Sequence, residues 1–315
     1  QYKSISSVSP GATLESIRSY TLQGWVSGIS ARLNEADLFS QEIGFDQAQM
    51  PAGMLPQYGG KTSSITDNWH NNGAQLSSKS RFFDYDHAGR LSLERTNGTA
   101  VTYSYDPRGN ILSESGPDRG ASYAYDGEKL ISVNVSGGNQ QSCSFAHDAL
   151  GRMVYNGMTG QQISYNDLDL VRNIESNGTT LVNYSYLADG TKLSATDAQG
   201  EGLVYRGAFV YRRGADSSLT LESAGFSGGR LTGASVLMYA TDYLGSVRAV
   251  VDGRTGELYK AVDYSSYGEE TIVEAAGVSG GITLRDGYTG KEDQHPDFGT
   301  SYTDFGARQY HPTLH

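Results

Sequence analysis

Aromatic residues alternate with small or polar residues in short runs along the middle of the chain. Tyr103 and Tyr105 are separated by one serine, and Tyr123 and Tyr125 by one alanine. A spacing of two residues places both rings of a pair on the same face of a β-strand. The pattern therefore predicts a series of short strands whose tyrosines line one face of a sheet.

One phrase, an aromatic residue followed by aspartate and then by glycine, returns about every twenty residues in this region. A period of this length suits a β-hairpin, which consists of two short strands and two turns. The aromatic or histidine positions of the copies are Tyr85, Tyr105, Tyr125, His147, Tyr165, Tyr186 and Tyr205. The turn positions of the clearest copies are Asp86, Gly89, Asp106, Gly109, Asp126, Asp148, Gly151, Asp189 and Gly190.

Each copy of the phrase carries a turn signal. In Asp86-x-x-Gly89 the aspartate can bond backbone amides two residues on, and the glycine accepts a positive φ. Between the phrases, Asn97-Gly98, Gly137-Gly138 and Asn177-Gly178 favour two-residue hairpin turns. A long antiparallel meander curls because sheets twist. We therefore expect an all-β fold of spiralling antiparallel hairpin repeats, which forms a curled, barrel-like sheet or a partial hollow shell.

Helical patterns are scarce. Residues 12–20 and 34–41 are the two segments that favour short helices, with loops as the alternative for both. Asn34 is a candidate N-cap for the second segment, and Asp37 lies in its first turn.

Composition supports the β interpretation, because 40 of the 315 residues are glycine and 22 are tyrosine. Glycine supplies turns, and tyrosine suits a half-buried strand surface. The net charge of -11 argues against partners that carry phosphate, both nucleic acid and anionic lipid. No apolar run approaches the roughly 20 residues needed for membrane insertion. The first residues lack the apolar centre of a signal peptide, and a start on Gln1 indicates a processed product or an excised fragment.

The repeated phrases closely resemble the YD repeats of RHS proteins, a group that includes toxin-complex shell proteins and the animal teneurins. Residues 242–269 read DYLGSVRAVVDGRTGELYKAVDYSSYGE, which is similar to the RHS repeat-associated core. GTKL at 190–193 and YRGAFVY at 205–211 resemble the version of the family that is common in Bacteroides-type bacteria. YTGKED at 288–293 and DFGARQYHP at 304–312 resemble later segments of that core. The matching positions are Asp242, Leu244, Gly245, Arg248, Tyr264, Gly268, Gly290, Lys291, Gly306, Arg308 and Tyr310.

The resemblance divides the chain into three parts of one continuous structural unit. Residues 1–80 are interpreted as degenerate N-terminal repeats, residues 81–211 as YD-type hairpin repeats, and residues 212–315 as the core, truncated before the self-cleavage element. The resemblance implies a bacterial protein, secreted or at the cell surface as part of a larger polypeptide. It also implies a structural, non-enzymatic shell, and the partner that it implies is a C-terminal effector, usually a toxin, which this chain does not contain.

The family core typically ends in an aspartyl self-cleavage element, and Arg308 matches an arginine of that site. The pair of aspartates expected after it is absent from this chain, so we expect no self-cleavage. Two other functions stay open. Exposed tyrosine rings would suit a carbohydrate-binding or adhesion surface, and Asp304 with Asp297 near Arg308 would suit a remnant autoprotease.

Other reactive side chains favour structural roles. The repeated aspartates suit turns better than calcium ligands or general acids. Cys143 and His147 share a strand face but stand four residues apart, roughly 13 Å, which is too far for a hydrogen bond. His295, His311 and His315 lack the spacing of a helical metal site. We therefore expect no cofactor and no metal.

Overall fold

The computed structural model describes residues 2–8, 11–46, 50–117, 119–137, 140–233, 235–276 and 282–314. Within these residues one antiparallel sheet of 25 strands runs through most of the chain. Each strand pairs with the next strand in sequence, from β1 with β2 to β24 with β25. The expectation of an antiparallel hairpin meander is thus confirmed.

This sheet forms a long strip, and the strip begins with six strands of 6 to 12 residues. These are β1 (Tyr2–Ser7), β2 (Thr13–Tyr20), β3 (Val26–Leu33), β4 (Ala36–Gly44), β5 (Ser64–Asn71) and β6 (Ala74–Tyr85). The hairpins that follow are shorter. They comprise β7 (Leu91–Thr96), β8 (Thr99–Tyr105), β9 (Ile111–Ser115), β10 (Gly120–Asp126), β11 (Lys129–Ser136), β12 (Gln141–His147), β13 (Met153–Asn156) and β14 (Gln161–Tyr165).

The strip then continues to its last turn. Its strands are β15 (Val171–Ser176), β16 (Thr179–Tyr186), β17 (Lys192–Thr196), β18 (Gly202–Arg206), β19 (Phe209–Arg213), β20 (Leu219–Phe226) and β21 (Gly229–Thr232). The last group is β22 (Val236–Thr241), β23 (Val247–Asp252), β24 (Leu258–Tyr264) and β25 (Glu270–Ala275).

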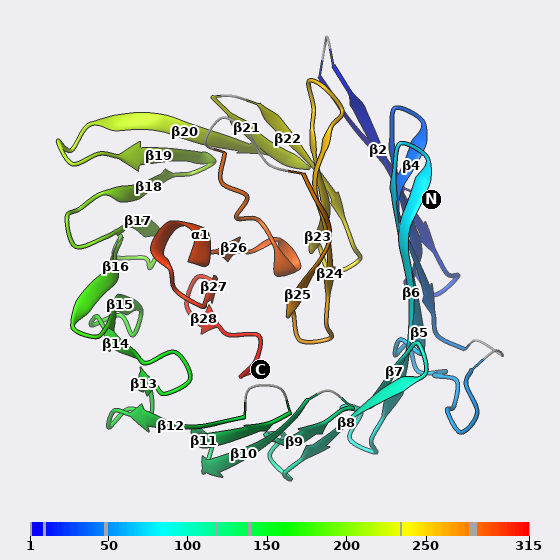
Figure 1. Ribbon diagram of the computed structural model, residues 1–315, viewed down its shortest axis with the longest axis horizontal. Coiled ribbons are helices and arrows are strands. Elements are labelled where there is room, and N and C mark those ends of the chain that lie inside the picture. The colour runs from blue at the N-terminus through cyan, green and yellow to red at the C-terminus, as the bar shows by residue number, and fades with distance from the viewer. Residues whose placement is uncertain are drawn as a thin grey trace.

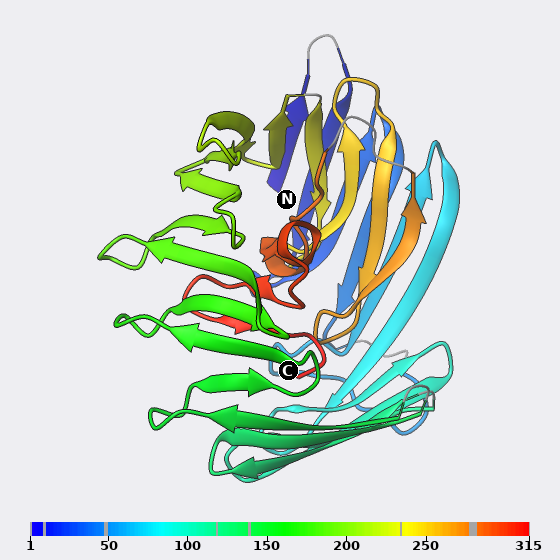
Figure 2. The ribbon, with the colours of Figure 1, turned by 60° about the vertical axis from the view of Figure 1, so that its left-hand side comes forward.

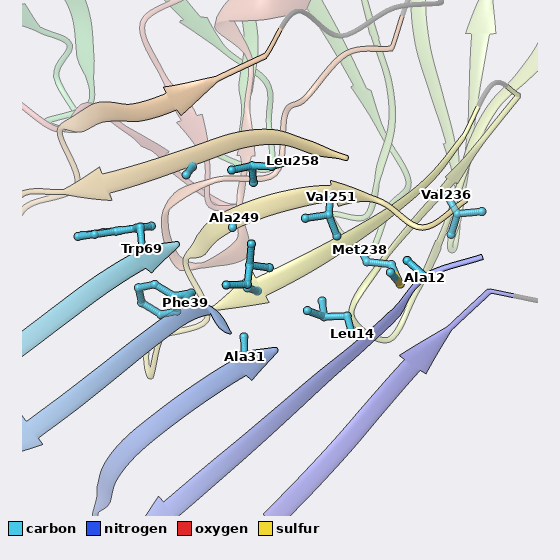
Figure 3. Close-up of a cluster of buried hydrophobic side chains, with 13 residues drawn as sticks. Ala12, Leu14, Ala31, Phe39, Trp69, Val236, Met238, Ala249, Val251 and Leu258 are labelled. Carbon is cyan, nitrogen blue, oxygen red and sulfur yellow. The ribbon is translucent and has the colours of Figure 1, made fainter. Parts of the chain in front are cut away.

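The strip curls round until its last strands lie against the inner side of its first strands (Figure 1; Figure 2). A buried apolar cluster fills the space between these two layers (Figure 3). Phe39 and Trp69 come from β4 and β5, and they meet Met238 and Val251 from β22 and β23. The overlap therefore makes a two-layered core, while the middle hairpins form a single curved wall. The sheet curls as the sequence predicts.

Both segments with a predicted helical pattern are strands. Residues 13–20 form β2, which is hydrogen-bonded to β1 and to β3, and residues 36–41 belong to β4. Asn34 has a φ of 47° and Glu35 a φ of 69°. Positive φ at both positions makes a type I′ hairpin turn between β3 and β4, so Asn34 cannot cap a helix there. The helix prediction was wrong because asparagine is as common in such turns as at helix N-caps.

The C-terminal segment lies on the hollow side of the strip (Figure 1). It contains the 3-10 turn η1 (Tyr288–Gly290), the short helix α1 (His295–Phe298) and a small sheet of β26 (Glu292–Asp293), β27 (Thr303–Asp304) and β28 (Gln309–Tyr310). In the described part of the chain, no helix has the length and apolar character needed to cross a membrane.

Candidate functional site

The phrase aspartates hold the turns at one end of the hairpins. The Asp86 carboxylate accepts a hydrogen bond from the Arg90 amide at 2.9 Å and another from Arg90 Nε at 2.7 Å. Gly89 has a φ of 82°, and its amide donates to the Asp86 carbonyl at 2.9 Å. The bond from the Arg90 amide is the main cause that holds the pKa of Asp86 below its usual value. Each oxygen of this carboxylate is therefore engaged within its own turn.

Other copies repeat this geometry with different partners. Asp148 accepts the Arg152 amide at 2.9 Å and Arg152 Nε at 2.6 Å. Asp106 accepts the amide and the side-chain nitrogen of Asn110 at 2.9 and 2.8 Å. The remaining copies differ: Asp189 accepts the Thr191 amide beside Gly190, and Asp126 ends β10 directly before Gly127. Gly109 and Gly151 both have positive φ.

The basic residue that ends a phrase lies over the tyrosine of the next copy. Arg90 lies 4.6 Å from the Tyr105 ring centroid, and Arg152 lies 4.7 Å from that of Tyr165. Tyr105 and Tyr165 in turn donate their hydroxyls to carbonyls of the preceding strand, at 2.7 and 2.8 Å. Burial raises the pKa of Tyr165 to about 12, so its hydroxyl stays a donor at neutral pH. Successive hairpins are thus linked through their tyrosines, a role that the sequence analysis did not assign to Arg90 and Arg152. The signal was the arginine that directly follows the phrase glycine in both copies.

Buried ion pairs and hydrogen bonds hold the C-terminal segment against the wall. The fully buried Arg285 side chain donates from Nε to Asp297 at 2.9 Å and from Nη1 to Glu222 of β20 at 3.0 Å. Tyr205 of β18 donates to Glu292 at 2.7 Å, and Lys192 of β17 pairs with Asp304. Because these partners come from β17 to β20, this part of the wall is the binding surface for the segment. Sequence analysis did not single out Arg285, which belongs to no repeated phrase.

A hollow of about 1060 Å³ lies beside the end of this segment. Its lining includes Tyr105, Tyr125 and Tyr165 from the wall and Tyr267 and Tyr310 from the core region. The lining also includes Leu314, the last described residue, which packs against the apolar cluster of β9 to β12. The last described residue of the chain thus lies at a hollow whose lining contains several tyrosines.

A second group of buried charges joins the two layers of the strip, and we call it the interlayer cluster. It consists of Asp67, Arg81, Asp242, Arg248 and Asp263. Arg248 of β23 donates to Asp67 of β5 at 3.0 Å and to Asp263 of β24 at 2.7 Å. Arg81 of β6 donates to Asp67 and, at 2.9 Å, to Asp263. Each layer thus contributes an arginine and an aspartate to one buried network.

The surroundings of the cluster are aromatic as well as charged. The Arg248 guanidinium lies 5.0 Å from the Trp69 ring and 5.4 Å from the Phe39 ring. Trp69 donates its Nε1 proton to the Val262 carbonyl at 3.1 Å, which is a further bond between the layers. Asp242 and Arg248 were identified from the family resemblance, and Asp263 lies in the segment 242–269 that carries this resemblance. Asp67 and Arg81 carry no repeated signal in the sequence.

The cluster gives the stability of the protein a defined pH dependence. Burial alone would raise the pKa of Asp263, but Arg81 and Arg248 outweigh burial and hold that pKa below its usual value. The stabilisation from Asp263 is therefore present above about pH 4, its unfolded pKa, and is lost as the pH falls further. We expect Asp263→Asn to be less stable than the wild type at pH 7, with the difference narrowing in acid because the wild-type carboxylate becomes neutral. Urea unfolding across this pH range measures the difference, and a constant difference down to the lowest pH would contradict the assignment.

The pKa of Asp242 is shifted in the opposite direction to that of Asp263. Burial raises its pKa despite the nearby Arg248, so its ionised form costs stability as the pH rises. Its carboxylate accepts the amides of Leu244 and Ser246, both at 2.9 Å, in the turn that contains Gly245. The Asp242 carboxylate therefore holds the turn between β22 and β23 in the same way that Asp86 holds its own turn.

The other positions that match the RHS repeat-associated core lie around the contact between the C-terminal segment and the rest of the chain. Gly268 has a φ of 86°, and a Cβ there would lie 2.6 Å from the Tyr288 ring. Tyr288 packs against buried Tyr264 and stacks on Tyr310, whose hydroxyl donates to the Tyr267 carbonyl at 2.7 Å. The others flank this group: Gly290 and Gly306 have positive φ, and Lys291 lies over the Phe305 ring.

The residues weighed for catalysis have different partners. Arg308 is exposed and lines the hollow, whereas Asp297 pairs with Arg285 and Asp304 pairs with Lys192. Asp297 and Asp304 therefore have separate basic partners, and neither of those partners is Arg308.

The cysteine and the histidines have separate surroundings too. Cys143 is buried, and burial raises the pKa of its thiol. Burial lowers the pKa of His147, whose ring lines the hollow. His295 begins α1, His311 lines the hollow, and His315 lies outside the described residues. Among the described residues, no group of three or more histidine, cysteine, aspartate or glutamate side chains is placed to hold a metal ion.

The comparisons with known proteins agree with this geometry. Residues 85–121 match the RHS Repeat family model. This match covers the Tyr85 and Tyr105 phrases, in which aspartate turns and tyrosine links repeat. No curated protein sequence matches the chain.

The fold is similar to solved structures of toxin complexes. With the Photorhabdus luminescens Tc holotoxin pore, solved with a mutation in TccC3, the TM-score is 0.55 at 14% identity, over 98% of this chain and 19% of that one. With the crystal structures of TcdB2-TccC3-TEV and TcdB2-TccC3, the TM-scores are 0.53 and 0.50, both at 14% identity. These matches cover 96% of this chain and 19% and 20% of the other chains. The chain thus spans about a fifth of the length of the solved chains that it resembles.

Proposed function

We propose that the chain is a wall segment of an RHS-type shell, and that its hollow side holds a C-terminal effector polypeptide. The observation that carries the proposal is the position of the C-terminal segment, which lies on the concave side of the wall and whose last described residue, Leu314, lines the hollow. A polypeptide joined after this point would begin inside the curl. The wall itself acts by enclosing and positioning, without catalysis.

The match of residues 85–121 to the RHS repeat and the likeness in fold to toxin-complex chains support this role. Since those chains are about five times longer, further repeats of the same kind would complete the enclosure. We assign the protein to a bacterial toxin or surface protein that acts outside the cell, with the effector as its partner.

The test is protection of an added peptide from protease. A short cleavable peptide is fused after His315 in one variant and before Gln1 in the other. We expect the C-terminal peptide to be cut at least about tenfold more slowly, because it follows closely after Leu314, which lines the hollow, whereas β1 is the first strand of the sheet and is mostly exposed. Equal cleavage rates for the two fusions would overturn the proposal. A third variant, with the same peptide in the exposed turn at Asn97-Gly98, controls for the intrinsic cleavage rate.

A further inference from the structure

Lys192 lies between two carboxylates of the C-terminal segment. Its Nζ contacts Asp304 Oδ2 and lies 3.6 Å from Glu292 Oε2. Glu292 and Asp304 are directly opposite each other in the pairing of β26 with β27. The exposed fractions of the three side chains are 16% for Lys192, 18% for Glu292 and 6% for Asp304. One amine and two carboxylates thus meet where Asp304 is buried and the other two side chains are largely shielded from water.

Lys192 differs from the equivalent residues of other repeats. Like Arg90 and Arg152, it ends a phrase and lies over the next tyrosine, with its Nζ 4.3 Å from the Tyr205 ring centroid. Arg90 and Arg152 each pair with the aspartate of their own turn. Lys192 instead turns toward the C-terminal segment. An amine, unlike a guanidinium, is also a competent nucleophile when it loses a proton.

The two oxygens of Asp304 have different surroundings. Oδ1 accepts the Gly306 amide at 2.6 Å, whereas Oδ2 faces Lys192 and lies 3.4 Å from Gln294 Nε2. Glu292 is also oriented, because its Oε1 accepts the Tyr205 hydroxyl at 2.7 Å and its Oε2 is directed to the lysine. A backbone amide aimed at one oxygen of a carboxyl group is the usual means of stabilising negative charge that develops there.

We propose that Lys192 and Asp304 join in an intramolecular amide (isopeptide) bond, with Glu292 as the proton carrier. Glu292 takes a proton from the Lys192 ammonium and passes it to Asp304 Oδ2. The neutral Nζ then attacks Asp304 Cγ, and the Gly306 amide binds the charge that develops on Oδ1. Glu292 transfers a second proton from Nζ to Oδ2, which leaves as water. One N–C bond forms, one C–O bond breaks, and no oxidant or reductant is needed.

The buried environment favours this product. Tyr205, which lies beside Lys192 and donates to Glu292, packs against the apolar cluster formed by β14 to β19 with Phe298 and Tyr302. Two buried charges in such surroundings cost desolvation free energy, and the amide replaces both of them with one neutral group. The bond would tie β17 to β27 whether or not the shell carries an effector.

The test is the mass of the full chain after it has folded and is then denatured. We expect the wild-type mass to be lower than the sequence mass by one water molecule. A protease digest should contain one branched peptide in which Lys192 and Asp304 are joined, and a succinimide, which also loses water, would join no peptides. Lys192→Arg keeps the cation over Tyr205 but should show the full sequence mass, and Glu292→Gln should slow the loss of water at least about tenfold. Lys291→Arg, a change at a nearby lysine outside the group, should behave as the wild type.

Two outcomes would overturn the proposal. One is a folded wild-type chain that keeps its full sequence mass after prolonged incubation. The other is a loss of water that persists in Lys192→Arg, because the reaction would then lie elsewhere in the chain.

Discussion

We expect Arg248→Met to lower the free energy of unfolding by about 3–5 kcal/mol, the usual cost of removing one partner from a buried ion pair. Arg248 is 2% exposed, and its guanidinium lies between Asp67 and Asp263. Methionine keeps much of the side-chain volume, so the loss comes from the Asp67 and Asp263 carboxylates. They keep Arg81 as a shared partner, with Lys79 at Asp263 and the Gln41 side-chain amide at Asp67. Urea unfolding followed by tryptophan fluorescence measures the change, since Trp69 lies beside Arg248.

Lys79→Met is the matched control for this prediction. Lys79 binds the same Asp263, at 2.7 Å, but its side chain is 32% exposed. Because the Lys79 end of this pair is partly open to water, we expect Lys79→Met to cost less than Arg248→Met, closer to the contribution of about 0–1 kcal/mol that surface ion pairs make. If both variants lost the same free energy, burial would not be the reason for the importance of Arg248, and the interlayer cluster would not be the contact that holds the layers together.

Arg285→Met should release the first half of the C-terminal segment while the sheet stays folded. Arg285 is the shared partner of Asp297 and Glu222, and its removal leaves both carboxylates without that cation, at a cost of about 3–5 kcal/mol. Amide hydrogen exchange between Arg285 and Phe298 should accelerate by at least about a hundredfold, because each 1.4 kcal/mol is worth about a factor of ten. The amide of Asp293, which donates to the Arg285 carbonyl at 2.7 Å, is the most direct reporter.

Arg212→Met is the control for Arg285→Met, because it also removes a cation that binds Asp297, but one at the surface. Arg212 donates to the same Asp297 at 2.9 Å, but its side chain is 44% exposed, so we expect little acceleration. Faster exchange of the β22 to β24 amides in Arg285→Met would contradict the prediction, because it would show that the segment and the sheet open together.

The hairpin architecture follows directly from the spacing of the phrases. Tyrosines two residues apart define the inner face, and Asp86-x-x-Gly89 and Asn97-Gly98 define the two ends of a hairpin. These signals are local, and local signals determine which strands pair in a meander. The error at Asn34 has the same origin, since the local preference of asparagine serves a type I′ turn as well as a helix cap.

Local signals could not predict the contact between the two layers or the position of the C-terminal segment against the wall. Asp67 and Asp263 lie far apart in the sequence and belong to no shared motif, so nothing local indicates that one lies over the other. Lys192 could be placed in its phrase, but its partners Glu292 and Asp304 depend on how far the strip curls. The curl is the sum of many small twists, and the sequence does not specify their total.

The separation between the two layers has a consequence for synthesis of the chain. Trp69 bonds to the carbonyl of Val262, 193 positions later in the chain. At about 5–20 residues per second, a ribosome needs roughly 10–40 s to add that interval. During this time β2 to β5 can already pair with one another, yet the apolar side that carries Leu14, Phe39 and Trp69 has no second layer to cover it. A nascent chain of this protein is therefore exposed to aggregation for far longer than its hairpins take to form, about 1–10 μs each.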